Sequence, residues 1–193
     1  MDVRTTTDLT AEPVSLAVMR NYLEFTATDT AEDTEITAMI KSARQLLERR
    51  SGLALGLKTL TVLFKASEVI NDSVVLPYSP FVSITTIKLV DIQGTKTTLT
   101  LNSDYFKQGL FNMTVYISSM GVGILPGASP TGQDVEVIYV CGYGAGSETL
   151  PAVWAQLIKD QVKIWYLRGD GDTSQLSANI ANAVDSMTNN VWL

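Results

Sequence analysis

The sequence predicts an α+β fold, a small helical bundle with a β-rich insertion between its second and third helices. Apolar residues recur at helical spacing near both ends of the chain, whereas between residues 58 and 142 they alternate with polar ones. A glycine-rich turn then leads into one long apolar helix. The expected parts are an N-terminal helical part (1–57), the β-rich insertion (58–142), the long helix that completes the helical body (143–169) and a C-terminal arm (170–193).

The N-terminal part is expected to hold two helices. Ser15 is a suitable N-cap for a short first helix with one narrow apolar stripe. Thr30 and Asp33 have the spacing of a capping box and open a second, longer amphipathic helix, for which Gly52 is the expected stop. Cations crowd the second half of that helix, and we interpret them as complementing the negative end of the helix dipole rather than as a phosphate site. They are Lys41, Arg44, Arg49 and Arg50.

The third helix is expected to open at Leu150-Pro151 and to run through Arg168 to a stop at Gly169. Its apolar residues cover more than one stripe, so it requires burial on two sides. We expect the other two helices to cover one side and a neighbouring copy of the chain to cover the other. The candidate subunit-interface residues are Trp154, Leu157, Ile158, Trp165 and Tyr166.

Within the insertion, alternating residues from Leu60 to Phe64 predict a strand, and the turn Asn71-Asp72-Ser73 precedes the next one. The alternation slips at Thr85-Thr86, which predicts a bulge. The last strand spans residues 135–141. Glycines and prolines from Gly121 to Gly132 predict a long loop that is mobile or orders against a partner.

The C-terminal arm is polar, with sparse apolar residues whose helical spacing is compatible with a weak helix. Its last three residues, Val191, Trp192 and Leu193, place a large aromatic side chain where a chain ordinarily frays. We expect them to dock on a partner, because tryptophan is over-represented among residues that anchor interfaces.

Composition narrows the function. The 193 residues are 46% hydrophobic, enough for a real core, and the net charge of −6 disfavours tight binding of phosphate. One cysteine forms no internal disulfide, and neither a signal peptide nor an apolar run long enough to span a membrane is recognised. We therefore expect a protein that is made in the cytoplasm.

The sequence contains few residue patterns that are typical of catalytic or metal-binding sites. The chain has no histidine, which excludes histidine-dependent nucleophilic sites and the usual zinc ligand sets. Cys141 is expected to be a small buried side chain, and the glycines 142, 144 and 146 to be a hinge, not a phosphate loop. The carboxylates near turns are read as solvated surface, and Asp170-Gly171-Asp172 as a turn, not a calcium loop. These carboxylates are Asp91, Asp104, Asp134 and Glu136. No catalytic residue, cofactor or metal is expected.

Four blocks of the chain, in order from Glu12 to Arg168, form a recognisable series: Glu12-Pro13-Val14-Ser15-Leu16; the acidic stretch 29–35 with the helix up to Gly52; Leu76-Pro77 through Ile84 with Ile87 and Asp91-Ile92-Gln93-Gly94; and Tyr139-Val140-Cys141-Gly142-Tyr143-Gly144 with Leu150-Pro151 and Tyr166-Leu167-Arg168. By these blocks the chain resembles the head-tail connector (adaptor) family of long-tailed bacteriophages. The sequence after Arg168 has no counterpart.

The resemblance implies a virion structural protein at the head-tail interface. It would form a homo-oligomeric ring, of the portal's twelvefold symmetry, between the portal protein and a stopper or tail-completion protein. DNA would pass through the ring without specific binding, and no membrane would be involved. Val191, Trp192 and Leu193 are the candidate portal-docking residues.

Three alternatives stay open. A β-rich carbohydrate-binding module would use Tyr105, Tyr116 and Tyr143 as stacking platforms. An enzyme acting through carboxylates is a more distant alternative. Within the structural class, a tail-completion protein is the nearest alternative to a connector.

Overall fold

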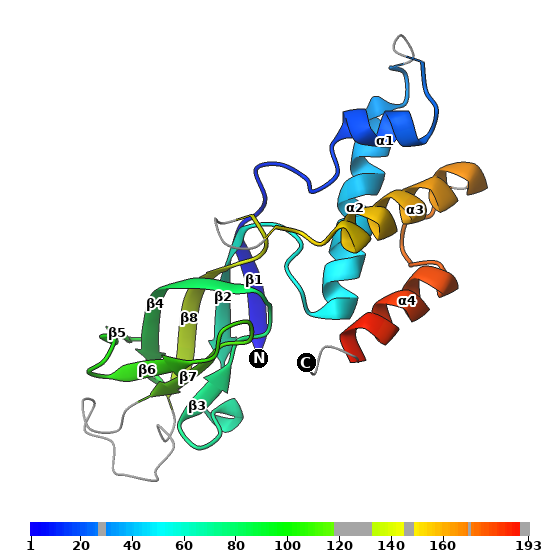
Figure 1. Ribbon diagram of the computed structural model, residues 1–193. Helices are drawn as coiled ribbons and strands as arrows, with labels where there is room; N and C mark the ends of the chain where they lie inside the picture. Colours follow the sequence, from blue (N-terminus) through cyan, green and yellow to red (C-terminus); the bar gives the residue numbers. More distant parts are fainter. Residues whose placement is uncertain (27–29, 118–132, 145–148, 170, 190–193) are drawn as a thin grey trace. The chain divides into compact units, whose positions relative to one another are not determined.

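The computed structural model describes residues 1–26, 30–117, 133–144, 149–169 and 171–189. The chain forms two compact units, one of Met1–Asp8 and Leu57–Ala145 and the other of Leu9–Gly56 and Gly146–Leu193. The first unit holds the strands and the second holds the helices (Figure 1). The predicted α+β class is confirmed.

The strands of the first unit form two antiparallel sheets (Figure 1). The larger sheet has the order β1 (Asp2–Thr7), β2 (Lys58–Phe64), β8 (Asp134–Cys141), β4 (Phe81–Val90) and β5 (Lys96–Thr98). The smaller one has the order β3 (Ser73–Val75), β7 (Thr114–Ile117) and β6 (Tyr105–Gln108), and a short 3-10 helix, η1 (Ala66–Glu68), follows β2.

Strand register places the buried residues of β2 and β8 on one face of the larger sheet. Leu60 pairs with Tyr139 and Val62 with Val137, and all four side chains are buried. Because side chains alternate across a strand, the period-two pattern of the sequence becomes one buried face. The predicted bulge is confirmed, since the register of β4 against β8 shifts between Ile84 and Thr86.

The helical unit contains α1 (Leu16–Tyr22), α2 (Asp33–Ser51), α3 (Ala152–Arg168) and α4 (Ala178–Asn189). Ser15 caps α1 as predicted, its Oγ accepting from the Val18 N–H at 3.3 Å. Gly52 and Gly169 end α2 and α3 in the left-handed conformation that glycine adopts without strain. The expected capping box is wrong: the N-cap of α2 is Glu32, and no side chain caps it.

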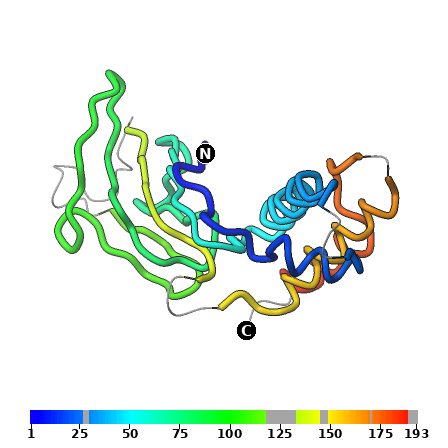
Figure 2. Tube along the Cα trace, turned by 90° about the horizontal axis from the view of Figure 1, so that it is seen from above, coloured from blue at the N-terminus to red at the C-terminus, as the bar shows by residue number. Residues whose placement is uncertain are grey.

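The expected arrangement of two N-terminal helices and one C-terminal helix is also wrong, because the described part of the chain holds a fourth helix, α4. Ile180 and Val184 of α4 are buried, so packing stabilises a helix that its polar sequence leaves weak. Figure 2, a view close to the axis of α2, shows the other three helices on one side of it. Their shared core contains Val14, Met19, Ile36, Met39, Ile40, Ala43, Leu47, Leu55, Trp154, Leu157, Ile158, Val162, Trp165, Ile180 and Val184.

Strand β1 is an element that the sequence pattern did not predict. Its sequence, Asp-Val-Arg-Thr-Thr-Thr, shows no alternation of apolar and polar side chains, and all six residues are exposed. Pairing with β2, from Asp2 opposite Leu63 to Thr7 opposite Thr59, holds the strand in place. The loop expected from Gly121 to Gly132 lies outside the described residues.

Candidate functional site

The five candidate interface residues of α3 lie mostly inside the helical unit. Trp154, Leu157, Ile158 and Trp165 are at most 8% exposed and belong to the core of their own chain. Tyr166 is half-buried, and its ring meets Phe25 edge-on at a centroid distance of 5.4 Å. Contact of these five residues with a second copy stays a prediction. Their burial means that other residues of α3 form its surface.

That surface carries exposed apolar side chains. Val153, Ile164 and Leu167 are 45%, 38% and 72% exposed. Positions 153, 164 and 167 share one face of a helix with 3.6 residues per turn. The helix is therefore apolar on two sides, as the sequence suggested, but the side that faces solvent has different residues from those expected.

Two lysines beside this apolar face flank Tyr22 of α1. The Nζ atoms of Lys159 and Lys163 lie 5.1 and 5.2 Å from the centroid of the Tyr22 ring. The Tyr22 hydroxyl donates to Asp160 Oδ1 at 2.5 Å and accepts from Gln156 Nε2 at 3.1 Å. The hydrogen bond to the Asp160 carboxylate raises the pKa of the Tyr22 phenol. This cluster joins α1 to α3 and holds two half-buried cations beside the apolar face.

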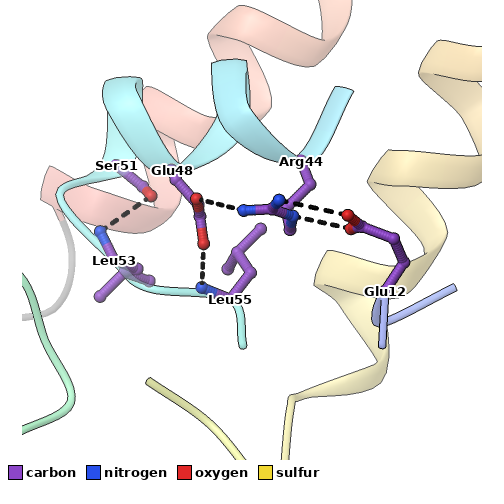
Figure 3. Close-up of polar contacts among 6 residues, drawn as sticks. All are labelled: Glu12, Arg44, Glu48, Ser51, Leu53 and Leu55. Carbon is purple, nitrogen blue, oxygen red and sulfur yellow. Dashed lines mark hydrogen bonds and ion pairs between the residues drawn. The ribbon is translucent and has the colours of Figure 1, made fainter. Parts of the chain in front are cut away.

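A buried ionic cluster fixes the two segments that lead into and out of the helical unit. Arg44 is 1% exposed, and its guanidinium lies between two carboxylates (Figure 3). Nε donates to Glu12 Oε2 at 2.7 Å and one terminal nitrogen donates to Glu48 Oε2 at 2.9 Å. Glu48 Oε1 in turn accepts from the Leu55 N–H at 2.9 Å. The residue read as part of a dipole-complementing cation cluster is thus a structural anchor, and the spacing of Arg44 and Glu48 at i and i+4 was the sequence signal for it.

Helix α4 is attached to the rest of the unit by polar contacts as well as by its core residues. Arg50 pairs with Asp185 through two hydrogen bonds of 2.7 and 2.5 Å. Gln161 Oε1 accepts from the Ser177 N–H at 2.8 Å, which positions the segment that leads into α4. The candidate docking residues Val191, Trp192 and Leu193 follow this helix and lie outside the described residues.

The residues considered for other chemistries are placed unfavourably for them. Tyr105 and Tyr143 are each 7% exposed, so neither offers a ring face to a sugar. The ring of Tyr116 stacks on that of Phe106, with 4.9 Å between the ring centroids. Cys141 is buried and forms no disulfide, as predicted.

Each of the four carboxylates considered for acid-base chemistry has a partner within the chain. Asp91 and Asp104 accept backbone N–H groups, and Asp134 and Glu136 pair with lysines. Within the described ranges, no group of side chains is suited to holding a metal ion, and no helix has the length and apolar character to cross a membrane. The surface of the helical unit, where Val153, Ile164 and Leu167 of α3 are exposed, is the candidate functional site.

The sequence matches no protein-family profile and no characterised protein. Solved structures, however, contain the same fold. A chain in the neck of an empty gene transfer agent (GTA) particle, computed with C6 symmetry, has a TM-score of 0.73 at 21% identity, covering 96% of this chain and 94% of that one. A chain in the virion of a native GTA particle has a TM-score of 0.72 at 24% identity, covering 97% and 94%.

A further chain, in the neck of a native GTA particle computed with C12 symmetry, has a TM-score of 0.69 at 20% identity, covering 97% and 94%. At these identities the similarity establishes a shared fold. It extends over both units and includes nearly the whole length of each chain.

Proposed function

We propose that this chain is a structural protein of the neck of a phage-like particle, a head-tail connector that forms a ring between the portal and the stopper or tail-completion protein. The observation that supports the proposal is the shared fold, which covers 94% of each of the GTA chains, two of which come from particle necks. The helical unit also presents a surface suited to association rather than to catalysis.

The ring is proposed to have twelve copies, in line with the portal symmetry that the connector resemblance implies. DNA passes through it without specific binding, because a chain with a net charge of −6 does not hold phosphates tightly. The candidate residues Val191, Trp192 and Leu193 dock on the portal, and α3 takes part in contacts between copies. No enzymatic activity is proposed.

The experiment is assembly on a portal. The purified chain is mixed with the portal protein of the same particle, and the complex is measured by native mass spectrometry and electron microscopy. We expect a ring of copies on one end of the portal. A folded chain that binds purified tails but not the portal would identify a tail-completion protein, and one that binds neither would overturn the proposal.

A further inference from the structure

One side of α3 carries apolar and cationic side chains next to each other. Lys159, Lys163 and Leu167 follow each other at intervals of four residues, and Ile164 lies beside them. Side chains at these spacings are neighbours on a helix surface. Leu167 is 72% exposed and Ile164 38%, so the apolar part of this face is left uncovered by the described residues of the chain. An uncovered apolar row next to charges is typical of an interaction surface.

The charges on this face lack carboxylate partners within the described part of the chain. Asp160 pairs with neither lysine and instead accepts from Tyr22 and Gln156, while Lys159 and Lys163 contact the Tyr22 ring. An ammonium group over an aromatic ring keeps its full positive charge. The positive charges of this face are therefore complementary to exposed carboxylates, and its apolar side chains require a partner surface with small side chains that allows close approach.

The chain itself provides such a surface at the start of α2. Glu32 and Glu35 are both exposed, and within the described residues neither takes part in an ion pair. Asp33 between them is occupied by Arg20, with both carboxylate oxygens accepting at 3.1 and 3.0 Å. Ala31 and Ala38, also exposed, leave room for an approaching helix. Both carboxylates sit on or beside the first turn of a rigid helix, so they offer a fixed negative patch.

We propose that the α3 face formed by Lys159, Lys163, Ile164 and Leu167 binds the start of α2, at Glu32 and Glu35, of a second copy of this chain. The inference rests on the proposed ring and names its contact between copies. In the proposed ring each copy gives its α3 face to one neighbour and its α2 start to the other, so the contact is heterologous, and such a contact forms a ring when the rotation between copies closes. Opposite charges set the register, and burial of Ile164 and Leu167 supplies affinity.

A charge exchange tests the contact. Lys163→Glu places like charges at every contact with the native Glu35, and Glu35→Lys does so with the native Lys163. Each variant alone is expected to assemble on the portal at least tenfold less tightly than the unchanged chain. An equimolar mixture restores assembly, because alternating copies of the two variants have opposite charges at every contact. Arg49→Glu, an equal charge reversal at an exposed position at the other end of α2, is the matched control and leaves assembly unchanged.

Cross-linking identifies directly which molecule binds the α3 face. Chains with Glu35→Cys and chains with Lys163→Cys are mixed on the portal and treated with a bifunctional maleimide. The unchanged chain, whose single cysteine Cys141 is buried, measures the background of cross-linking. A cross-linked pair that contains one of each variant is expected. A cross-link from position 163 to a cysteine of the portal, with none to position 35 of another copy, would assign the face to the portal and overturn the inference.

The outcomes separate the two proposals. If both charge variants assemble like the unchanged chain, or if the mixture fails to recover, this contact is wrong while the ring remains supported. If the unchanged chain does not assemble on the portal at all, the proposed function and the contact both fail. Circular dichroism of each variant is the control for folding, and we expect the helical signal of the unchanged chain in every variant.

Discussion

Arg44 and Glu12 are 32 positions apart in sequence, and the guanidinium of one meets the carboxylate of the other through hydrogen bonds of 2.7 and 3.2 Å. Glu12 belongs to the segment between β1 and α1, and the same guanidinium also holds Glu48, which accepts from the Leu55 N–H. Two connecting segments of the chain are thus fastened to α2 at one point. Within this attachment Arg44 and Glu48 are 1% and 4% exposed, whereas Glu12 is 23% exposed.

Replacing Arg44 with methionine is expected to destabilise the helical unit by about 3 kcal/mol, because the buried carboxylate of Glu48 loses its cation. Urea unfolding followed by circular dichroism measures the change. The triple variant Glu12→Gln, Arg44→Met, Glu48→Gln removes all three charges and should recover part of the loss. A stability equal to that of the unchanged chain in Arg44→Met would show that the cluster has no anchoring role. Arg49→Met, at an exposed position, is the control.

The core of the helical unit and the exposed face of α3 respond differently to truncation. Ile158 is fully buried, so Ile158→Ala is expected to cost about 3 kcal/mol through lost burial and an unfilled cavity. Leu167 is 72% exposed, and Leu167→Ala should change the free energy of unfolding by less than about 0.5 kcal/mol. Denaturant unfolding of the monomer compares the two. Similar losses for both variants would mean that Leu167 is covered within the monomer.

The contrast between these two residues shows what could be predicted from the sequence. Apolar spacing indicates that a side chain is buried, but not which chain buries it. Trp154, Ile158 and Trp165 were therefore assigned to a contact between copies although α2 and α4 provide neighbours in the same core. The ends of α2 and α3 were predicted well, because Gly52 and Gly169 leave a local signal that does not depend on tertiary structure.

The elements that the sequence predicted weakly, such as α4, or not at all, such as β1, depend on distant partners. Strand β1 exists through its pairing with β2, and no apolar alternation in its own six residues indicates it. Helix α4 depends on Ile180 and Val184 reaching a core formed by residues far away in sequence. The Lys159 and Lys163 contacts with Tyr22 also join distant segments, so no local pattern brings these residues together.

The attachment of α4 is expected to weaken in acid. The hydrogen-bonded guanidinium of Arg50 holds the pKa of the Asp185 carboxyl below its usual range. A carboxyl whose pKa is depressed by folding stabilises the folded state above its unfolded pKa, about 4, and loses that contribution as the pH falls through the lower folded value. NMR shifts of the α4 amides between pH 6 and about 2.5 should therefore report loosening at the acid end of this range. In Asp185→Asn this step should be absent, and an unchanged acid transition in that variant would assign the loosening to other groups.

Deletion of Val191, Trp192 and Leu193 tests the proposed portal contact separately from the fold. These residues follow α4, whose attachment to the unit uses Ile180, Val184 and the pair of Arg50 and Asp185. Because none of these attachments involves the last three residues, the truncated chain should unfold at the same denaturant concentration as the full chain. Binding to the portal, measured by biolayer interferometry, is expected to be lost, since a tryptophan that anchors an interface contributes a large share of its affinity. Trp192→Ala should reproduce most of the loss, and Asn190→Ala should not. Unchanged portal binding after the deletion would place the docking residues elsewhere on the chain.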